Sequence, residues 1–323
     1  MGHGKLRKFA ENETFACLVQ PAAEEVLSGR GREFALKDHP LKGHWNEKMF
    51  DAPRPIVLEL GCGRGEYTID LARRNPDYNY IGVDIKGARL WRGAKEATLS
   101  KMGNVAFLRT RIEFIPAFFA PSEVAEIWLT FSDPQLHHEN SRLSSPLFLK
   151  RYREFLAPGG LIHLKTDSMF LHQYTLALCR ENSFPILARS EDLYTDIRES
   201  RRARLGGAEA LSDAQVDAIF EVHTYYETMF SRQGYRITYL CFCPWAVGQP
   251  EGFGPVRACG AIPPNQGWAP PVHEATGGHA VQSPQADQRH TWASENILSP
   301  SSFDADYWRS VEGPRHSVAL PDL

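Results

Sequence analysis

Residues 54–67 read RPIVLELGCGRGEY, and this stretch decides the fold class. Its first seven residues are mostly apolar and are typical of a buried strand. The turn GCGRG follows at once, and its glycines permit a tight bend and the close approach of a ligand to the backbone. The next residues, YTIDLARR, repeat apolar side chains at helical spacing. This order of strand, turn and helix predicts an α/β sheet that binds a ligand at the carboxyl ends of its strands.

Strand and helix signals continue to alternate as far as residue 243. We expect strands at residues 54–60, 78–85, 104–110, 124–131, 161–167, 185–194 and 235–243. We expect helices at residues 67–74, 88–102, 111–119, 146–160, 169–182 and 213–232, with Pro158 and two glycines closing the fourth of them. Helical crossovers make neighbouring strands parallel, so these elements predict a mostly parallel, seven-stranded sheet with helices on both faces.

The composition indicates a cytoplasmic globular protein with an unusual C-terminal segment. The chain has 323 residues, 42% of them hydrophobic, and a net charge of −3. No apolar run suits a signal peptide or a membrane helix, and the six cysteines form no disulfide framework or metal-binding pattern. We divide the chain into a lead-in segment (1–50), a main domain (51–243) and an acidic tail (244–323). Eleven prolines and eight glycines predict that the tail is disordered.

The spacing and charge around the glycine turn discriminate between two classes of cofactor. A dinucleotide fingerprint requires a third glycine where Glu66 stands. Glu59 lies two residues before Gly61, and a carboxylate there would repel a pyrophosphate but attract a cation. Asp84, at the end of the second strand, is placed to accept the two hydroxyls of a ribose. We therefore expect Glu59, Gly61, Gly63 and Asp84 to bind S-adenosylmethionine.

Each acid at a strand end also has a purely structural interpretation. Glu59 could cap a turn, and Asp84 could be a solvated strand end. Asp133 follows the strand at residues 124–131 and precedes Pro134, so it could serve a ligand or cap the next turn. The sequence leaves these alternatives open.

Several motifs together resemble the tRNA (guanine-N7) methyltransferases, a family that modifies a guanosine in the tRNA variable loop. They are KLRKFAENETFACLVQP, LELGCGRGEY, IGVDIKGARLW, RTRIEFI, FSDP, KTD and HTYYETMFSRQG. The combination of FSDP, KTD and the T-x-Y-E segment is more specific than the glycine turn. The resemblance implies a Rossmann-like class I methyltransferase fold, S-adenosylmethionine as the cofactor, tRNA as the partner and no metal.

The resemblance also implies roles for particular residues. It places cofactor contacts at Glu59, Asp84 and Thr110 and the catalytic carboxylate at Asp133. It places contacts with the guanosine or with the methionine end of the pocket at Asp167, Thr224 and Glu227. Although His137 departs from the family, we expect it to donate a hydrogen bond to the substrate. The family usually has an acid where Thr110 stands. N7 of guanine carries a lone pair and no proton, so the transfer needs positioning rather than a general base. A carboxylate at Asp133 would hold the base and stabilise the positive charge that it gains.

The segment after Asp133 departs from the family. The family commonly continues D-P-W-x-K-K-R-H, whereas here Gln135 replaces the tryptophan, and His137 and His138 replace the lysines, leaving Arg142 basic. Losing phosphate contacts would weaken RNA binding and its salt dependence. Other cations could compensate or simply be solvated: Lys5, Arg7, Lys8, Arg198, Arg201, Arg202 and Arg204.

Two other functions also fit the sequence. A methyltransferase acting on a small molecule would share the fold and the glycine turn. A non-catalytic tRNA-binding partner subunit would fit the histidine pair and the non-acidic Thr110. The sequence does not distinguish a monomer from a homodimer.

Overall fold

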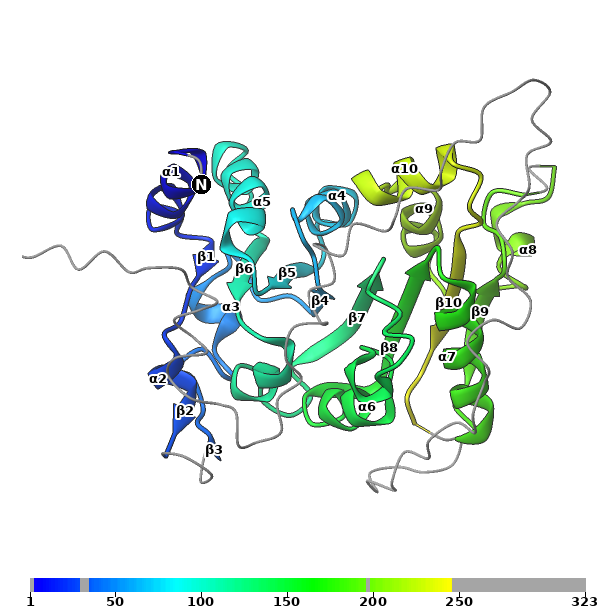
Figure 1. Cartoon of the computed structure of the whole chain (residues 1–323), viewed down its shortest axis with the longest axis horizontal. Helices are drawn as coiled ribbons and strands as arrows, with labels where there is room; N and C mark the ends of the chain where they lie inside the picture. Colours follow the sequence, from blue (N-terminus) through cyan, green and yellow to red (C-terminus); the bar gives the residue numbers. More distant parts are fainter. Residues whose placement is uncertain (1–2, 30–34, 196–197, 246–323) are drawn as a thin grey trace, which may run out of the picture.

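The fold is described from a computed structural model that places residues 3–29, 35–195 and 198–245 (Figure 1). The predicted tail lies outside these residues from position 246 onward. No helix in the described ranges combines the length and the apolar character needed to cross a bilayer.

The main sheet has eight strands within the described residues, in the order β1-β6-β5-β4-β7-β8-β10-β9. The strands are β1 (Leu18–Val19), β4 (Ile56–Leu60), β5 (Asn79–Asp84), β6 (Val105–Arg109), β7 (Val124–Thr130), β8 (Leu156–Thr166), β9 (Ile186–Ser190) and β10 (Thr238–Phe242). Neighbouring strands are parallel from β1 to β8, and β10 runs antiparallel to β8 and β9. The prediction of an α/β fold with a mostly parallel sheet is confirmed.

Helices cover both faces of this sheet. The longer ones are α1 (His3–Asn12), α4 (Glu66–Arg74), α5 (Gly87–Leu99), α6 (Pro146–Tyr152), α7 (Met169–Glu181), α9 (Asp213–Glu221) and α10 (Tyr225–Arg232). The shorter elements are α2 (Ala23–Val26), α3 (Trp45–Lys48), α8 (Arg201–Arg204), the 3₁₀ turns η1 (Ile112–Ala117) and η2 (Glu139–Ser141), and a hairpin of β2 (Leu27–Ser28) and β3 (Ala35–Leu36).

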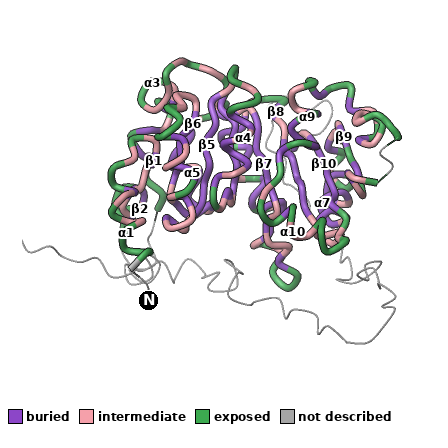
Figure 2. Tube along the Cα trace, turned by 90° about the horizontal axis from the view of Figure 1, so that it is seen from above, coloured by how far each residue is buried: buried purple, intermediate pink, exposed green. Residues whose placement is uncertain are grey.

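Alternating strand residues divide the apolar core into two layers. Leu58 and Leu129 pack with α6 and α7 on one face, whereas Val57 and Trp128 pack with α4 and α9 on the other. Figure 2 shows the result, with buried strands in the middle of the molecule and exposed residues around them. Burial on both faces explains why β4 reads as a nearly continuous apolar run.

The eighth strand corrects the predicted number of seven. β1 belongs to the lead-in segment, where Leu18 and Val19 pair with Phe107 and Leu108 of β6 and cover the edge of the sheet. A strand of two residues shows no periodicity, so its pairing could not be read from the sequence. The boundary predicted near residue 50 therefore does not separate the lead-in from the sheet.

Two predicted helices were also wrong in extent. α6 ends at Tyr152, and Pro158 with its two glycines lies inside β8, where the register against β7 shifts. A proline and glycines are tolerated there because an irregular strand leaves backbone groups outside the ladder. The helix expected over residues 213–232 is two helices, because Thr224 accepts a hydrogen bond from the Glu227 amide at 3.0 Å and starts α10 afresh.

Candidate active site

A cleft of about 820 Å³ opens at the carboxyl ends of β4, β7 and β8. In Figure 1 the arrowheads of β7 and β8 point toward α10, which borders the cleft through Tyr225. The predicted site residues that line the cleft are Glu59, Gly61, Gly63, Asp133, Asp167 and Thr224. Those that do not line it are Asp84, Thr110, His137 and Glu227. The fold therefore brings Glu59 of β4, Asp133 after β7 and Asp167 after β8 to one cleft, as the sequence predicted.

The glycines of the turn serve two different purposes. Gly63 has φ of +56°, and a Cβ on it would meet nothing within 4 Å, so this residue leaves open space beside the cleft. Gly65 has φ of +72°, and a Cβ there would lie 2.5 Å from the ring of Phe107. Gly65 is therefore needed for packing against β6, whereas Gly63 leaves room for a ligand.

Glu59 is held rigidly at the floor of the cleft. Its Oε1 accepts a hydrogen bond from the Thr130 hydroxyl at 2.6 Å, and its Oε2 accepts from the amide of Thr68 at 2.8 Å and from the Thr68 hydroxyl. Burial raises the pKa of this carboxyl to about 7, against the opposing effect of these hydrogen bonds. The turn cap that the structural interpretation expected is not seen, because the donors to Glu59 belong to α4 and β7, and the carboxylate also lines the cleft.

Asp84 supports the glycine turn from behind. One of its oxygens accepts from the Gly63 amide at 3.0 Å and the other from the Lys86 amide at 2.7 Å. The side chain is buried, so the alternative of a solvated strand end is wrong, and this burial raises its pKa. Thr110, just beyond β6, is also buried, and its hydroxyl finds no hydrogen-bond partner among the described residues. An unpartnered hydroxyl and the open space at Gly63 both fit a polar ligand such as S-adenosylmethionine.

The two acids on the opposite side of the cleft come from β7 and β8. Asp133 is partly exposed, and its Oδ1 accepts a hydrogen bond from the Gln135 amide at 3.0 Å. Asp133 therefore caps the turn, as one interpretation expected, and also lines the cleft. Asp167 follows β8, and burial raises its pKa to about 6. These carboxylates give this side of the cleft an affinity for cations or for N–H donors.

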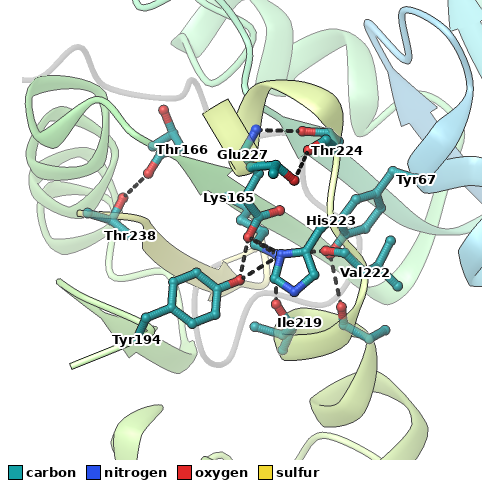
Figure 3. A network of polar contacts seen from close by, with 12 residues as sticks. Tyr67, Lys165, Thr166, Tyr194, Ile219, Val222, His223, Thr224, Glu227 and Thr238 are labelled. Carbon is teal, nitrogen blue, oxygen red and sulfur yellow. Dashed lines mark hydrogen bonds and ion pairs between the residues drawn. The ribbon is translucent and has the colours of Figure 1, made fainter. Parts of the chain in front are cut away.

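Glu227 lies in a buried network of polar contacts that joins β8, α9 and α10 (Figure 3). Its carboxylate pairs with the ammonium of Lys165 at 2.7 Å, and both side chains are fully buried. Lys165 also donates to the carbonyls of Ile219, at 2.7 Å, and Val222, at 3.1 Å. Lys165 therefore joins the end of α9 to α10, and Glu227 fixes α10 instead of facing the cleft.

Two further side chains reach the same carboxylate. The Tyr194 hydroxyl donates to Glu227, and Nδ1 of His223 lies 3.3 Å from it. Burial alone would raise the pKa of Glu227, but the hydrogen bond from His223 and the charge of Lys165 hold that pKa below its ordinary value. Glu227 is thus ionised and paired.

Two of the cations that the sequence suggested as phosphate contacts are paired with nearby acids. Arg201 pairs with Asp217 and Glu221, and Arg202 pairs with Asp213. Arg142, beyond the histidine pair, is buried, whereas His137 and His138 are exposed.

A basic rim borders the cleft, and of its four residues the sequence had suggested only Lys8 as an RNA contact. It consists of Lys8, Arg64, Arg89 and Arg92, from α1, the glycine turn and α5. Trp91 lies among them, with the Lys8 ammonium 4.7 Å from its ring centroid and its indole N–H donating to Glu11 of α1. This contact brings α1 beside α5, as Figure 1 shows. Arg64 inside the glycine turn and the two arginines after the second strand were the available signal in the sequence.

No cluster of three or more His, Cys, Asp or Glu side chains in the described part of the chain is placed to hold a metal ion.

Comparisons with known proteins agree on one family. Residues 53–205 match the family model described as a putative methyltransferase. A protein of Christiangramia forsetii named tRNA (guanine-N(7)-)-methyltransferase is 45% identical over 240 residues, which are 74% of this chain and 96% of that protein. Proteins of the same name are 45% identical in Bacteroides thetaiotaomicron, over 75% of this chain and 86% of the relative, and 47% identical in Porphyromonas gingivalis, over 66% and 79%.

Proposed function

The chain belongs to the tRNA (guanine-N(7)-)-methyltransferase family, and on this premise we propose that it transfers a methyl group from S-adenosylmethionine to N7 of a guanosine in the variable loop of tRNA. The observation that carries the proposal is one cleft lined by the glycine turn on one side and by Asp133 and Asp167 on the other. The cationic cofactor and the guanine that accepts its methyl group would meet in this cleft.

The residues present fit S-adenosylmethionine. Glu59 offers a carboxylate to the cationic end of the molecule, and the open side of Gly63 leaves room for it. Asp84 holds the Gly63 amide, and the Thr110 hydroxyl is buried without a partner among the described residues. Neither lines the cleft, and we propose that they contact the ribose and the adenine. When bound, the cofactor supplies a methyl group made electrophilic by the sulfonium charge.

Asp133 and Asp167 would orient the guanine. N7 has no proton to lose, so the chain needs no general base, and its contribution is alignment and electrostatics. A carboxylate can accept hydrogen bonds from N1–H and N2–H of guanine, and its negative charge stabilises the cationic ring of the product. Thr224 and the adjacent Tyr225 line the same cleft and would contact the nucleoside. His137 is exposed beyond the Asp133 turn and would reach only the surrounding RNA.

A direct assay tests this function. The purified chain, labelled cofactor and unmodified tRNA should give incorporation, followed by borohydride and aniline cleavage at one variable-loop guanosine. Activity on a metabolite that is insensitive to salt would favour a small-molecule methyltransferase. Tight tRNA binding with no incorporation would favour a non-catalytic subunit.

Cofactor affinity should depend on the ionisation of Glu59. Because burial raises the pKa of Glu59 to about 7, the carboxyl is mostly neutral near pH 6 and mostly ionised near pH 8. Only the ionised form attracts a sulfonium or an ammonium, so affinity should rise with pH, by up to roughly tenfold over this interval. Calorimetric titration with S-adenosylmethionine measures the change.

The Glu59→Gln variant is the control for this pH dependence. Asp167, whose pKa burial raises to about 6, titrates in the same cleft, so the difference between the two proteins isolates Glu59. The variant should bind more weakly near pH 8 and lose most of the pH dependence. Superimposable pH profiles for the two proteins would exclude an electrostatic role for Glu59.

We further propose that the basic rim contacts tRNA phosphates. Replacing Lys8 or Arg89 by Gln should weaken tRNA binding and lower the slope of log K against log salt by about one for each phosphate that the variant no longer binds. The matched control is Arg201→Gln, because Arg201 is already paired with Asp217 and Glu221. An equal loss of slope in this control would refute the assignment of the rim.

A further inference from the structure

The turn that carries Asp133 has an unusual backbone. Phe131 has φ of +50° and Gln135 has φ of +47°, and neither is a glycine. The left-handed region is unfavourable for residues with a Cβ and persists only where the surroundings enforce it. Two such residues stand on either side of Asp133, so something must hold this turn.

Arg142 supplies that support. Its Nε donates to the carbonyls of Pro134, at 3.1 Å, and Gln135, at 3.2 Å, and its Nη2 donates to the carbonyl of Leu136 at 3.1 Å. One planar guanidinium thus binds three successive carbonyls of the turn. Arg142 is only 6% exposed, so these carbonyls have a partner that water cannot easily replace.

The other side of Arg142 rests on α7. Its guanidinium lies 4.8 Å from the ring centroid of Phe170 and 4.4 Å from that of Tyr174. The Tyr174 hydroxyl donates to Glu139 of η2 at 2.7 Å, which closes the arrangement. Since α7 begins two residues after Asp167, Arg142 connects the segments that carry both carboxylates of this side of the cleft.

We propose that Arg142 is a positioning residue that fixes the Asp133 turn for methyl transfer, and that it is not a phosphate contact. This inference rests on the proposed function. An arginine that binds phosphate must present its guanidinium to solvent, whereas this one is buried among carbonyls and aromatic rings. Its fork geometry also explains why arginine is required, because an ammonium cannot bind several carbonyls in one plane.

Kinetics of Arg142→Ala and Arg142→Lys test the inference. Both variants should lose about 100-fold in kcat, the scale of a small misplacement of a catalytic group, with cofactor affinity preserved. The salt dependence of tRNA binding should stay that of the wild type. Guanidinium ion should partly restore Arg142→Ala, and ammonium should not. Near-normal kcat, or a salt slope lowered by about one, would overturn the proposal.

Two further measurements distinguish positioning of Asp133 by Arg142 from a general loss of structure and from failure of the proposed function. In an Asp133→Asn background, Arg142→Ala should lower kcat only slightly further, because both changes act through the same carboxylate. Losses in kcat that are fully additive would overturn the proposal. Hydrogen exchange at the Gln135 amide should accelerate in Arg142→Ala, and unchanged exchange would also overturn it. Since exchange requires no turnover, this result stands even if the wild type methylates no tRNA, an outcome that refutes the proposed function alone.

Discussion

Asp133→Asn is expected to lower kcat for methyl transfer by roughly 100- to 1,000-fold, the range for removal of one preorganised electrostatic group. The negative charge that stabilises the methylated guanine is lost, while the Asn carbonyl can still accept the hydrogen bond that Gln135 gives to Oδ1. The turn should therefore keep its shape, and calorimetry should show nearly unchanged cofactor affinity. Single-turnover assays with saturating tRNA measure the effect.

The same variant distinguishes catalysis from turn capping. If Asp133 did no more than cap the turn, Asn would serve equally well and turnover would stay near normal. A matched control is Asp77→Asn. Asp77 is exposed and precedes β5, so it lies at the amino ends of the strands, whereas the cleft lies at their carboxyl ends. Comparable losses in both variants would point to a general electrostatic effect rather than to a role for Asp133.

The sequence predicted the parallel core of the fold well, because strands buried on both faces read as apolar runs. β4, β5, β6, β7 and β10 lie within the ranges expected for them. The errors occurred where pairing or local hydrogen bonds decide the structure. β1 exists because Leu18 and Val19 find β6, and the break before α10 follows from the Thr224 cap, for which Thr-x-x-Glu was a visible signal.

The sequence predicted those site residues that lie at the carboxyl ends of parallel strands. Glu59, Asp133 and Asp167 reach one cleft because the carboxyl ends of parallel strands meet at the same edge. Charge pairing was not predictable, since it depends on which acids the tertiary fold brings near. Arg201 is neutralised by residues of α9, whereas Arg89 remains at the rim of the cleft.

Lys165→Met is expected to destabilise the protein by about 3–5 kcal/mol, the cost of leaving a buried charge without its partner. Glu227 would stay buried without its ion pair, and the carbonyls of Ile219 and Val222 would lose their donor (Figure 3). The Tyr194 hydroxyl would still donate to Glu227, and Nδ1 of His223 lies 3.3 Å from it, but the ammonium that pairs with the carboxylate would be gone. Urea unfolding at neutral pH measures the change in the free energy of unfolding.

The double variant Lys165→Met with Glu227→Gln should recover part of that loss, because it removes the unpaired charge together with its partner. A double variant less stable than Lys165→Met alone would contradict the buried ion pair as the source of the effect. The pair also bears on the site, since Thr224 and Tyr225 line the cleft from the start of α10. When α10 loosens, KM for tRNA should rise more than the dissociation constant of the cofactor, because Glu59 and the glycine turn lie on other elements.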